Sequence, residues 1–400
     1  MSDTPLHSKR PLRTAQLIQT LGMGGAENLA VQIANAQAAA GHISHLYVLS
    51  HPGPLSSRVH QDVHTHYLDY DQATQGNLWR ILLSIRRGFR LISQRIRADG
   101  IDVVQTHLPR ANFLGLLLAW RGVCNVVATV HNNEEFHYGD SANPARVKLR
   151  REAYRQILRR CQATVAVSEG VRQSLIRQLR LSPVQAERLV TVTNGVEIPQ
   201  PLTAAEKQAI RDKYRVAPGV PLVVTAGRLT EQKNFASLVA AAAELRSQQI
   251  TCRIIIAGEG PLRQDLESQI RELQVSDLVQ LPGNVIEMRE LMQSADLFVL
   301  PSLWEGLPLV LLEAMACGLP VVGSRIKGVT DVFADDRSGL LVEPGDSRGL
   351  AEAMIRLIGS AEERAYLASE GRAIVQNRFS FARVAQELET LYRRVILPAS

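Results

Sequence analysis

The stretch at residues 296–322, DLFVLPSLWEGLPLVLLEAMACGLPVV, most constrains what this chain can fold into. Residues 297–300 are a short apolar run, which is typical of a strand buried on both faces of a parallel sheet. A helix is predicted from Pro308 to about Cys317, because proline suits a first helical turn, and Gly318 fits the left-handed residue that ends a helix. A second apolar run follows at once, so the stretch predicts a strand–helix–strand unit of a parallel sheet.

Two glutamates in this stretch are spaced to meet one ligand. Glu305 lies in the loop before the helix and Glu313 lies within the helix. Eight residues at helical geometry span about 12 Å and turn by about 80°, so the two carboxylates would lie on roughly one side of the unit. Backbone N–H groups around Gly306, Leu307 and Leu309 would be open to an anion or to sugar oxygens. The alternative is that both glutamates are simply solvated.

Apolar runs of this kind alternate with helical patterns along both halves of the 400-residue chain. This length suggests two domains, and the 46% hydrophobic content supports a full core in both. The alternation predicts an α/β fold with a doubly wound parallel sheet in each half. The expected boundaries are residues 1–198 for the first domain, 199–378 for the second, and 379–400 for a terminal helix that crosses back to the first.

The excess of positive over negative charge is confined to the first half of the chain. The net charge is +6, but residues 1–200 hold 23 Lys and Arg against 14 Asp and Glu, whereas residues 201–400 hold 22 against 25. This asymmetry suggests that the first domain meets an acidic partner. We expect that partner to be an anionic membrane surface and not a nucleic acid.

Two helices expected in the first half concentrate these cations. The helix at residues 78–97 has an apolar stripe at helical spacing, and its arginines lie off that stripe. The stripe consists of Leu78, Leu82, Ile85, Phe89, Ile92 and Ile96. The helix expected at residues 146–160 is also basic and contains seven Lys and Arg. Such faces are either solvated or in contact with the head groups of anionic lipids.

The sequence predicts a protein without a spanning segment. Residues 1–14 lack the apolar core of a secretory signal, and no apolar run is long enough to cross a bilayer. The four cysteines are widely spaced and form no C-x-x-C pair, so neither a zinc site nor a disulfide framework is indicated. We expect a cytoplasmic protein, soluble or peripheral on the inner face of the cytoplasmic membrane.

Residues suited to binding follow two strands of the expected first domain. Gly24 and Gly25 lie in a glycine-rich turn between a strand and a helix, where backbone N–H groups would meet phosphate. A tight turn that needs positive φ is the simpler alternative. His131 directly follows the strand at residues 126–130, and ligands of α/β sheets bind at such carboxyl ends. A structural role for His131 is the alternative.

Charged motifs elsewhere have different expected roles. Arg228 and Lys233 follow a strand that begins the second half, and a pair of cations in a partly closed cleft can clamp a diphosphate. A surface pair is the alternative. Asp69 and Asp71 form a D-x-D motif, whose paired carboxylates could hold a metal. It lies here between a short strand and a polar turn, so we interpret it as a solvated turn.

These motifs together resemble the signature of family 4 retaining glycosyltransferases. The resemblance rests on Glu305-x(7)-Glu313 with Gly306-Leu307-Pro308, on Gly227-Arg228-Leu229 with Lys233-Asn234, and on Pro282-Gly-Asn284-Val285. Looser similarities are Gly-Gly-Ala-Glu at 24–27 and Ala-Thr-Val-His at 128–131. The resemblance implies the GT-B fold, in which two Rossmann-like domains face each other across a cleft. The first domain would bind the acceptor and the second would bind the nucleotide-sugar.

The resemblance also implies residue roles. Arg228 and Lys233 would stabilise the leaving diphosphate, Glu305 would hold sugar hydroxyls, Glu313 the ribose, and His131 would orient the sugar. The nucleotide-sugar would be bound by Gly24, Gly25, Gly227, Asn284, Val285, Gly306, Leu307, Pro308, Leu309 and Glu313. No metal and no organic cofactor would be required. The donor would be a UDP-linked hexose or N-acetylhexosamine, and the acceptor a saccharide or lipid-linked saccharide in cell-surface polysaccharide synthesis.

Two other functions are compatible with these residues. A sugar-nucleotide epimerase or a phosphorylase could share the fold, although we find no motif for a second buried substrate or a pyridoxal lysine. A non-catalytic partner in a membrane assembly is also conceivable, and the joint presence of Arg228, Lys233, Glu305 and Glu313 argues against it. Incubation with a panel of sugar nucleotides separates the three, because they would yield slow hydrolysis, a changed sugar or no reaction.

Overall fold

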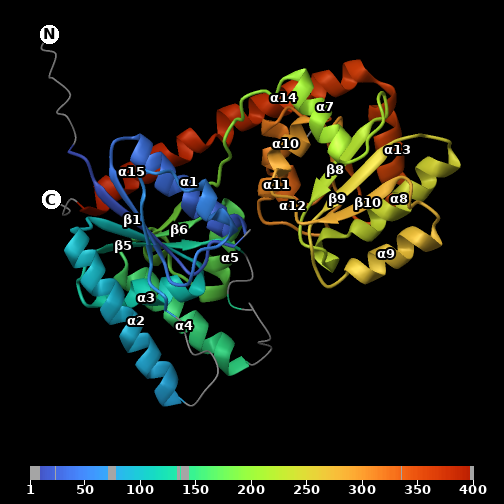
Figure 1. Cartoon of the computed structure of the whole chain (residues 1–400). Helices are drawn as coiled ribbons and strands as arrows, with labels where there is room; N and C mark the ends of the chain where they lie inside the picture. Colours follow the sequence, from blue (N-terminus) through green and yellow to red (C-terminus); the bar gives the residue numbers. More distant parts are fainter. Residues whose placement is uncertain are drawn as a thin grey trace, which may run out of the picture. The chain divides into compact units, whose positions relative to one another are not determined.

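The computed structural model describes residues 10–22, 24–70, 78–132, 136, 144–334 and 336–396. The chain divides into two compact units, of which the first comprises Met1–Thr193 with Val384–Ser400 and the second Asn194–Arg383. The sequence had suggested divisions at 198/199 and 378/379. Each unit holds its own parallel sheet with helices on both faces, so the predicted α/β class is confirmed (Figure 1).

The sheet of the first unit has seven strands in the order β3-β2-β1-β4-β5-β6-β7, and all of its pairings are parallel. Its strands are β1 (Arg13–Ile18), β2 (Ile43–Val48), β3 (His64–Tyr67), β4 (Val103–His107), β5 (Asn125–Val130), β6 (Ala163–Ala166) and β7 (Leu189–Thr191). The strand order reverses between β1 and β4. The two crossovers that leave this point run in opposite directions, so the loops after β1 and β4 diverge and leave a crevice at the carboxyl edge.

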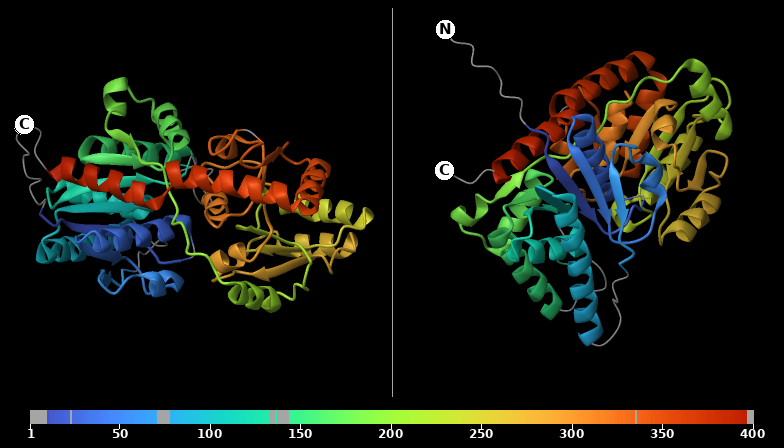
Figure 2. Two further views of the ribbon diagram at one scale, coloured as in Figure 1. Left: turned by 90° about the horizontal axis from the view of Figure 1, so that it is seen from above. Right: turned by 60° about the vertical axis from the view of Figure 1, so that its left-hand side comes forward.

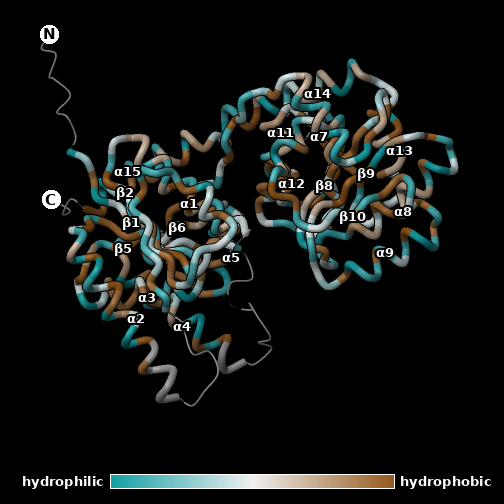
Figure 3. Tube along the Cα trace, in the orientation of Figure 1, coloured by the Kyte–Doolittle hydropathy of each residue, from teal (hydrophilic) through white to brown (hydrophobic). Residues whose placement is uncertain are grey.

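Helices cover both faces of this sheet. Its helices are α1 (Gly25–Ala39), η1 (Pro54–Arg58), α2 (Leu78–Asp99), α3 (Leu108–Trp120), α4 (Pro144–Arg160), α5 (Glu169–Leu179), α6 (Pro183–Ala186) and α15 (Phe381–Ile396). α1 and the chain-terminal α15 lie on one face, and α2, α3 and α4 lie on the other (Figures 1 and 2). Apolar residues are common in the inner strands such as β5, whereas the edge strand β3, His-Thr-His-Tyr, is polar (Figure 3).

The sheet of the second unit has six parallel strands in the order β10-β9-β8-β11-β12-β13. The strands are β8 (Leu222–Ala226), β9 (Arg253–Ala257), β10 (Val279–Gly283), β11 (Leu297–Leu300), β12 (Val321–Ser324) and β13 (Leu340–Val342). Here the order reverses between β8 and β11. The predicted charged motifs follow these two strands, so both reach the crevice of the second sheet.

The second unit has a core on each side of its sheet. Its helices are α7 (Ala204–Lys213), η2 (Glu231–Lys233), α8 (Phe235–Ser247), α9 (Arg263–Glu272), α10 (Met288–Gln293), α11 (Leu309–Ala316), α12 (Lys327–Thr330), α13 (Ser347–Gly359) and α14 (Ala361–Arg378). Residues of α8, α9 and α13 build one core, and residues of α10, α11, α12 and α14 build the other.

The central stretch folds as a strand–helix–strand unit, as predicted. β11, α11 and β12 follow one another, and Gly318 has the expected positive φ of 78°. One detail differs from the prediction. Pro308 is the N-cap residue with an extended ψ of 98°, and the helix begins at Leu309. The proline ring fixes only φ, so nothing local forces this residue into the first turn.

The apolar stripe of the basic helix faces the core of the first unit. Ile92 and Ile96 are buried, and Ile85 and Phe89 are partly buried. The side chains of Leu78 and Leu82 lie outside the described residues. No helix in the described part of the chain is long and apolar enough to cross a membrane.

Candidate functional site

A buried ion pair lies at the crevice of the second sheet. Lys233 closes the 3₁₀ helix after β8, and Glu305 lies in the loop after β11. Lys233 Nζ donates to Glu305 Oε1 at 2.6 Å, and the two side chains are only 15% and 8% exposed. Ser302 Oγ donates to the same oxygen at 2.8 Å, and Gln232 Nε2 donates to Glu305 Oε2 at 3.3 Å. The loops after the two strands are therefore joined through one carboxylate.

This pair keeps unused capacity for hydrogen bonding. A lysine ammonium has three donors, and a carboxylate has about four acceptor positions. Among the described residues, Lys233 uses one donor on Glu305, and Glu305 Oε2 accepts one hydrogen bond. Arg228, five residues before Lys233, is exposed and makes no ion pair with any residue the structure describes. A cation, Lys233, and an acceptor for hydroxyls, Glu305, therefore lie together.

Glycines let the backbone approach these side chains closely. A Cβ on Gly227 would lie 3.0 Å from Lys233 Cε, so the lysine stem packs directly over this residue. A Cβ on Gly258, where φ is 140°, would lie 2.0 Å from the carbonyl oxygen of Gly227. A Cβ on Gly328 would lie 2.7 Å from the carbonyl oxygens of Glu305 and Gly306. The loop that holds Glu305 therefore rests on the backbone of α12.

The remaining predicted residues of the second unit lie around the same sheet edge. Among the described residues no side chain caps the N-terminus of α11. The N–H of Leu311 bonds to the carbonyl of Pro308, which leaves the N–H groups of Leu309 and Val310 open. Glu313 lies within α11 and is partly buried. Asn284 and Val285 directly follow β10, and the first of them is exposed. Asp331, which directly follows α12, pairs with Lys327 at 2.8 Å.

The glycine-rich turn of the first unit already holds a carboxylate. Gly24 is the N-cap of α1, and a Cβ there would lie 2.2 Å from Glu27 Oε2. Thr20 Oγ1 donates to Glu27 Oε1 at 3.3 Å, and burial raises the pKa of Glu27 above its usual value. Glu27 thus occupies the place at the helix N-terminus where the sequence predicted phosphate. The expectation for Gly24 and Gly25 stays a prediction, with Glu27 as a competing anion.

His131 contacts a second histidine that the sequence analysis did not single out. His131 follows β5, and His107 ends the neighbouring strand β4. His131 Nε2 lies 3.2 Å from His107 Nδ1. Burial lowers the pKa of His131 to about 4 and lowers that of His107 well below its usual value. Both imidazoles are therefore neutral at pH 7.

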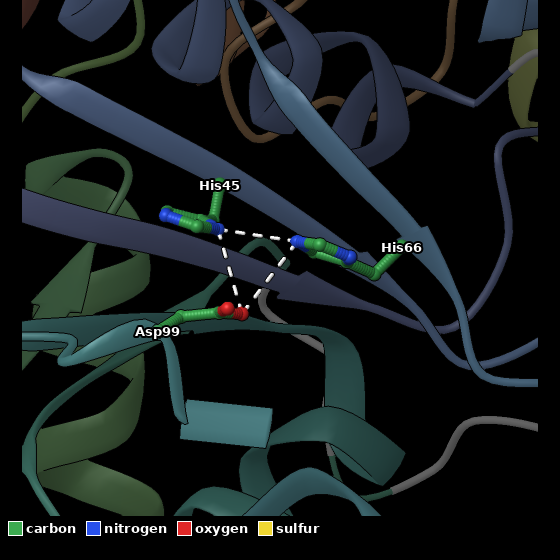
Figure 4. A group of neighbouring side chains, drawn as sticks. All are labelled: His45, His66 and Asp99. Atoms are coloured by element: carbon green, nitrogen blue, oxygen red, sulfur yellow. Dashed lines mark hydrogen bonds and ion pairs between the residues drawn. The ribbon is translucent and has the colours of Figure 1, made fainter. Parts of the chain in front are cut away.

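One group in the described part of the chain brings three metal-ligating side chains together: His45, His66 and Asp99 (Figure 4). The facing nitrogens of the two histidines are 3.1 Å apart, and each lies 3.6 Å from Asp99 Oδ2. That oxygen already accepts hydrogen bonds from Tyr47 at 2.7 Å and from Arg95 at 2.8 Å. The guanidinium supplies the positive charge that a metal would add. We interpret the group as a hydrogen-bonded cluster that joins β2, β3 and the end of α2.

The D-x-D motif directly follows the edge strand β3. Asp69 is exposed, has a positive φ of 46° and lies 3.3 Å from His51. Asp71 lies outside the described residues. The interpretation of the motif as a solvated turn therefore rests on Asp69.

Comparison with known families decides where this fold belongs. The model of Glycosyltransferase Family 4 matches residues 23–199, and the model of Glycosyl transferases group 1 matches residues 206–374. The two matches follow one another and together account for most of the chain. The chain belongs to the family 4 glycosyltransferases.

Individual relatives extend this match. N-acetyl-alpha-D-glucosaminyl L-malate synthase from Bacillus anthracis is 23% identical over 94% of this chain and 95% of its own length. Alpha-D-kanosaminyltransferase from Streptomyces kanamyceticus is 27% identical over 61% of this chain, and the alignment covers 63% of that protein. The structure of Anabaena Alr3699/HepE in complex with UDP and glucose superposes with a TM-score of 0.79 at 21% identity, over 95% of this chain and 99% of that one. This likeness confirms the GT-B fold.

Sequence reasoning missed several partners of the predicted residues in this glycosyltransferase. They are Ser302 and Gln232 beside Glu305, and His107 beside His131. Ser302 lies in a loop and Gln232 in the short 3₁₀ helix η2, and the sequence holds no signal for either. His107 ends a buried strand, as His131 follows one, and that shared position was a usable signal.

Proposed function

We propose that this chain is a metal-independent retaining glycosyltransferase. It transfers a hexose or N-acetylhexosamine from a UDP-sugar to a saccharide or lipid-linked saccharide. The observation that supports this most strongly is the buried Lys233–Glu305 pair with its spare donor and acceptor capacity. A nucleotide-sugar is both an anion and a polyol, and the pair offers a group for each.

The chemistry requires charge stabilisation at the leaving group. As the bond from the anomeric carbon to the diphosphate breaks, negative charge grows on the phosphate oxygens. Lys233 and the exposed Arg228 are cations that would stabilise this charge, which is the main electrostatic contribution in such reactions. Glu305 Oε2 would accept a hydrogen bond from a sugar hydroxyl, and Glu313 one from the ribose. The acceptor hydroxyl would lose its proton to the departing phosphate.

The proposed setting is cell-surface polysaccharide synthesis. Relatives include the UDP-Gal:alpha-D-GlcNAc-diphosphoundecaprenol alpha-1,3-galactosyltransferase of Escherichia coli, 26% identical over 74% of this chain and 76% of its own length. The acceptor of that relative is lipid-linked, and the first half of our chain has a net positive charge. We therefore propose that the first unit binds the cytoplasmic face of an anionic membrane peripherally.

The test is a panel of sugar nucleotides, with release of free sugar and nucleotide followed over time. Lys233→Ala should lower kcat/KM for the active donor by at least about 10²-fold. Lys213→Ala is the matched control, because Lys213 pairs with Glu287 at 3.2 Å on the exposed surface of the same unit. Equal activity of both variants would overturn the proposed role of the pair. Activity should also survive EDTA, and loss on chelation with rescue by Mn²⁺ would overturn metal independence.

A further inference from the structure

A chain of buried polar side chains connects His131 to the C-terminal helix. His107 Nε2 lies 2.8 Å from Gln16 Oε1, and Gln16 Nε2 donates to the hydroxyl of Tyr392 at 3.2 Å. The Tyr392 hydroxyl in turn donates to Gln105 Oε1. Gln105 Nε2 donates to Thr129 Oγ1 at 2.7 Å. All of these residues belong to the first unit.

Strand register places these hydrogen-bonded side chains on one face of the sheet. Gln16 of β1 and Gln105 of β4 are Cα partners, and His107 and Thr129 are partners on β4 and β5. Side chains two residues apart on a strand share a face, so Gln105 and His107 point the same way. Tyr392 reaches this face from α15. The helix therefore inserts a phenol between two strand glutamines.

The cost of burying polar groups restricts these side chains to one pattern of hydrogen bonds. Gln16, Gln105, His107, Thr129 and Tyr392 are each at most 1% exposed. A buried polar group without a partner is costly, so each of them must find one. The hydrogen bonds given above provide these partners without water. The hydrogen-bonded side chains are thus held in one arrangement by one another.

The directions of these hydrogen bonds determine the tautomers of both histidines. The Tyr392 hydroxyl gives its proton to Gln105, so it can only accept from the Gln16 amide nitrogen. Gln16 then turns its carbonyl oxygen toward His107, and an oxygen there requires N–H at His107 Nε2. In a neutral ring, His107 Nδ1 is then an acceptor. His131 Nε2 must carry the proton it donates to His107, which leaves His131 Nδ1 without one.

We propose that Tyr392 of the C-terminal helix, acting through Gln16 and His107, holds His131 as the Nε2–H tautomer. His131 then presents Nδ1 as a hydrogen-bond acceptor for a hydroxyl of the donor sugar. Tyr392, Gln16 and His107 are positioning residues, since they act only through His131. The part that concerns the sugar rests on the proposed function, whereas the tautomer does not.

The tautomer can be read directly by ¹⁵N NMR of the full chain labelled at histidine. His131→Gln identifies the signals of His131 among those of the 10 histidines. At pH 7 we expect Nε2 of His131 to have the shift of a protonated nitrogen and Nδ1 that of an unprotonated one. The same chain of hydrogen bonds with every direction reversed would put the proton on Nδ1, and that result would overturn the proposal.

Variants test whether Tyr392 sets this state. Tyr392→Phe keeps the ring but releases the Gln16 amide, so both tautomers of His131 should appear. Tyr47→Phe is the matched control, because Tyr47 is equally buried on the other face and donates to Asp99. An unchanged His131 spectrum in Tyr392→Phe would overturn the proposal. If Tyr392→Phe does not fold, Gln16→Met removes the acceptor for His107 and provides the same test.

Kinetics test the role of His131 toward the sugar separately from its tautomer. With the active donor, Tyr392→Phe should lower kcat by at least about tenfold and leave KM for the donor nearly unchanged, because a misplaced acceptor group affects the reacting geometry. A mixed tautomer with unchanged kcat would overturn the role toward the sugar. If no donor is turned over at all, the proposed function fails, and the NMR result still decides the tautomer.

Discussion

Lys233 Nζ lies 2.6 Å from Glu305 Oε1, although 72 residues separate them in the chain. The contact exists because β8 and β11 are neighbours at the point where the strand order reverses. Asn234 Nδ2 also donates to the carbonyl of Pro301 at 3.3 Å, so a hydrogen bond from a side chain to the backbone joins the two loops in addition to the ion pair. A rigid pair of loops would present a cation and a carboxylate at a constant distance to a bound donor.

The two glutamates should have separable roles. Glu305→Gln should lower kcat/KM by at least about 10²-fold, since the neutral amide is a poorer acceptor for a sugar hydroxyl. UDP should still bind, because Lys233 is then released from its ion pair. Glu313→Gln should instead weaken UDP binding. Titration calorimetry with UDP measures the second effect and steady-state kinetics the first. Variants that both match the parent in binding and turnover would contradict these roles.

The contact between the Glu305 loop and Gly328 of α12 should be sensitive to the addition of one methyl group at Gly328. Gly328→Ala places a Cβ 2.7 Å from two carbonyl oxygens of that loop, so the loop must shift. We expect a loss of about 1–3 kcal/mol in the free energy of unfolding and a clear loss of kcat/KM. Gly359→Ala is the control, because nothing lies within 4 Å of its added Cβ. Thermal melts and donor kinetics measure both. Normal activity of Gly328→Ala would show that the loop position is not critical.

Stability should fall as the pH is lowered from 7 to about 4.5. Burial lowers the pKa of His45 to about 4 and that of His107 well below normal, whereas unfolded histidine takes up a proton near pH 6.5. Between these values the unfolded chain binds more protons, so acid favours unfolding by up to about 1.4 kcal/mol per pH unit for each histidine. Melting temperatures across this range measure the slope.

A histidine variant tests the source of this slope. His45→Gln should reduce the slope of the free energy of unfolding against pH by about the contribution of one histidine. A parent protein whose melting temperature is constant between pH 7 and 4.5 would contradict neutral buried histidines.

The basic face of α2 should bind anionic vesicles. Arg86, Arg87 and Arg90 are exposed and make no ion pair with any described residue, and Leu83 beside them is 63% exposed. Each cation near an anionic surface contributes about 1 kcal/mol, and salt screens the attraction. Flotation should therefore require anionic lipid and weaken at high salt.

Neutralisation of those three arginines should reduce flotation without a change in UDP affinity. The control replaces Arg246, Arg325 and Arg348 of the second unit, which makes the same change in net charge. Equal flotation of both triple variants, or binding that ignores lipid charge, would contradict a membrane-binding face on α2.

Local sequence determined the α/β class, the alternation of elements and most of the charged candidates. Short apolar runs next to amphipathic periods leave few folds, and motifs such as Glu305-x(7)-Glu313 lie within one strand–helix unit, so their spacing is a property of the chain itself. The same holds for His131, whose place after a buried strand follows from the pattern alone.

Only the tertiary structure decided which distant side chains meet. The pairing of Lys233 with Glu305 depends on β8 lying beside β11, and sequence periodicity does not specify strand order. The contact of Tyr392 with Gln16 spans 376 residues, and it exists because α15 returns to the first sheet. Buried polar residues such as Gln16 and Gln105 look out of place in an apolar strand until their partners are known. Their partners come from other strands and from the last helix, so the hydrogen bonds that orient His131 are encoded by the fold and not by any one segment.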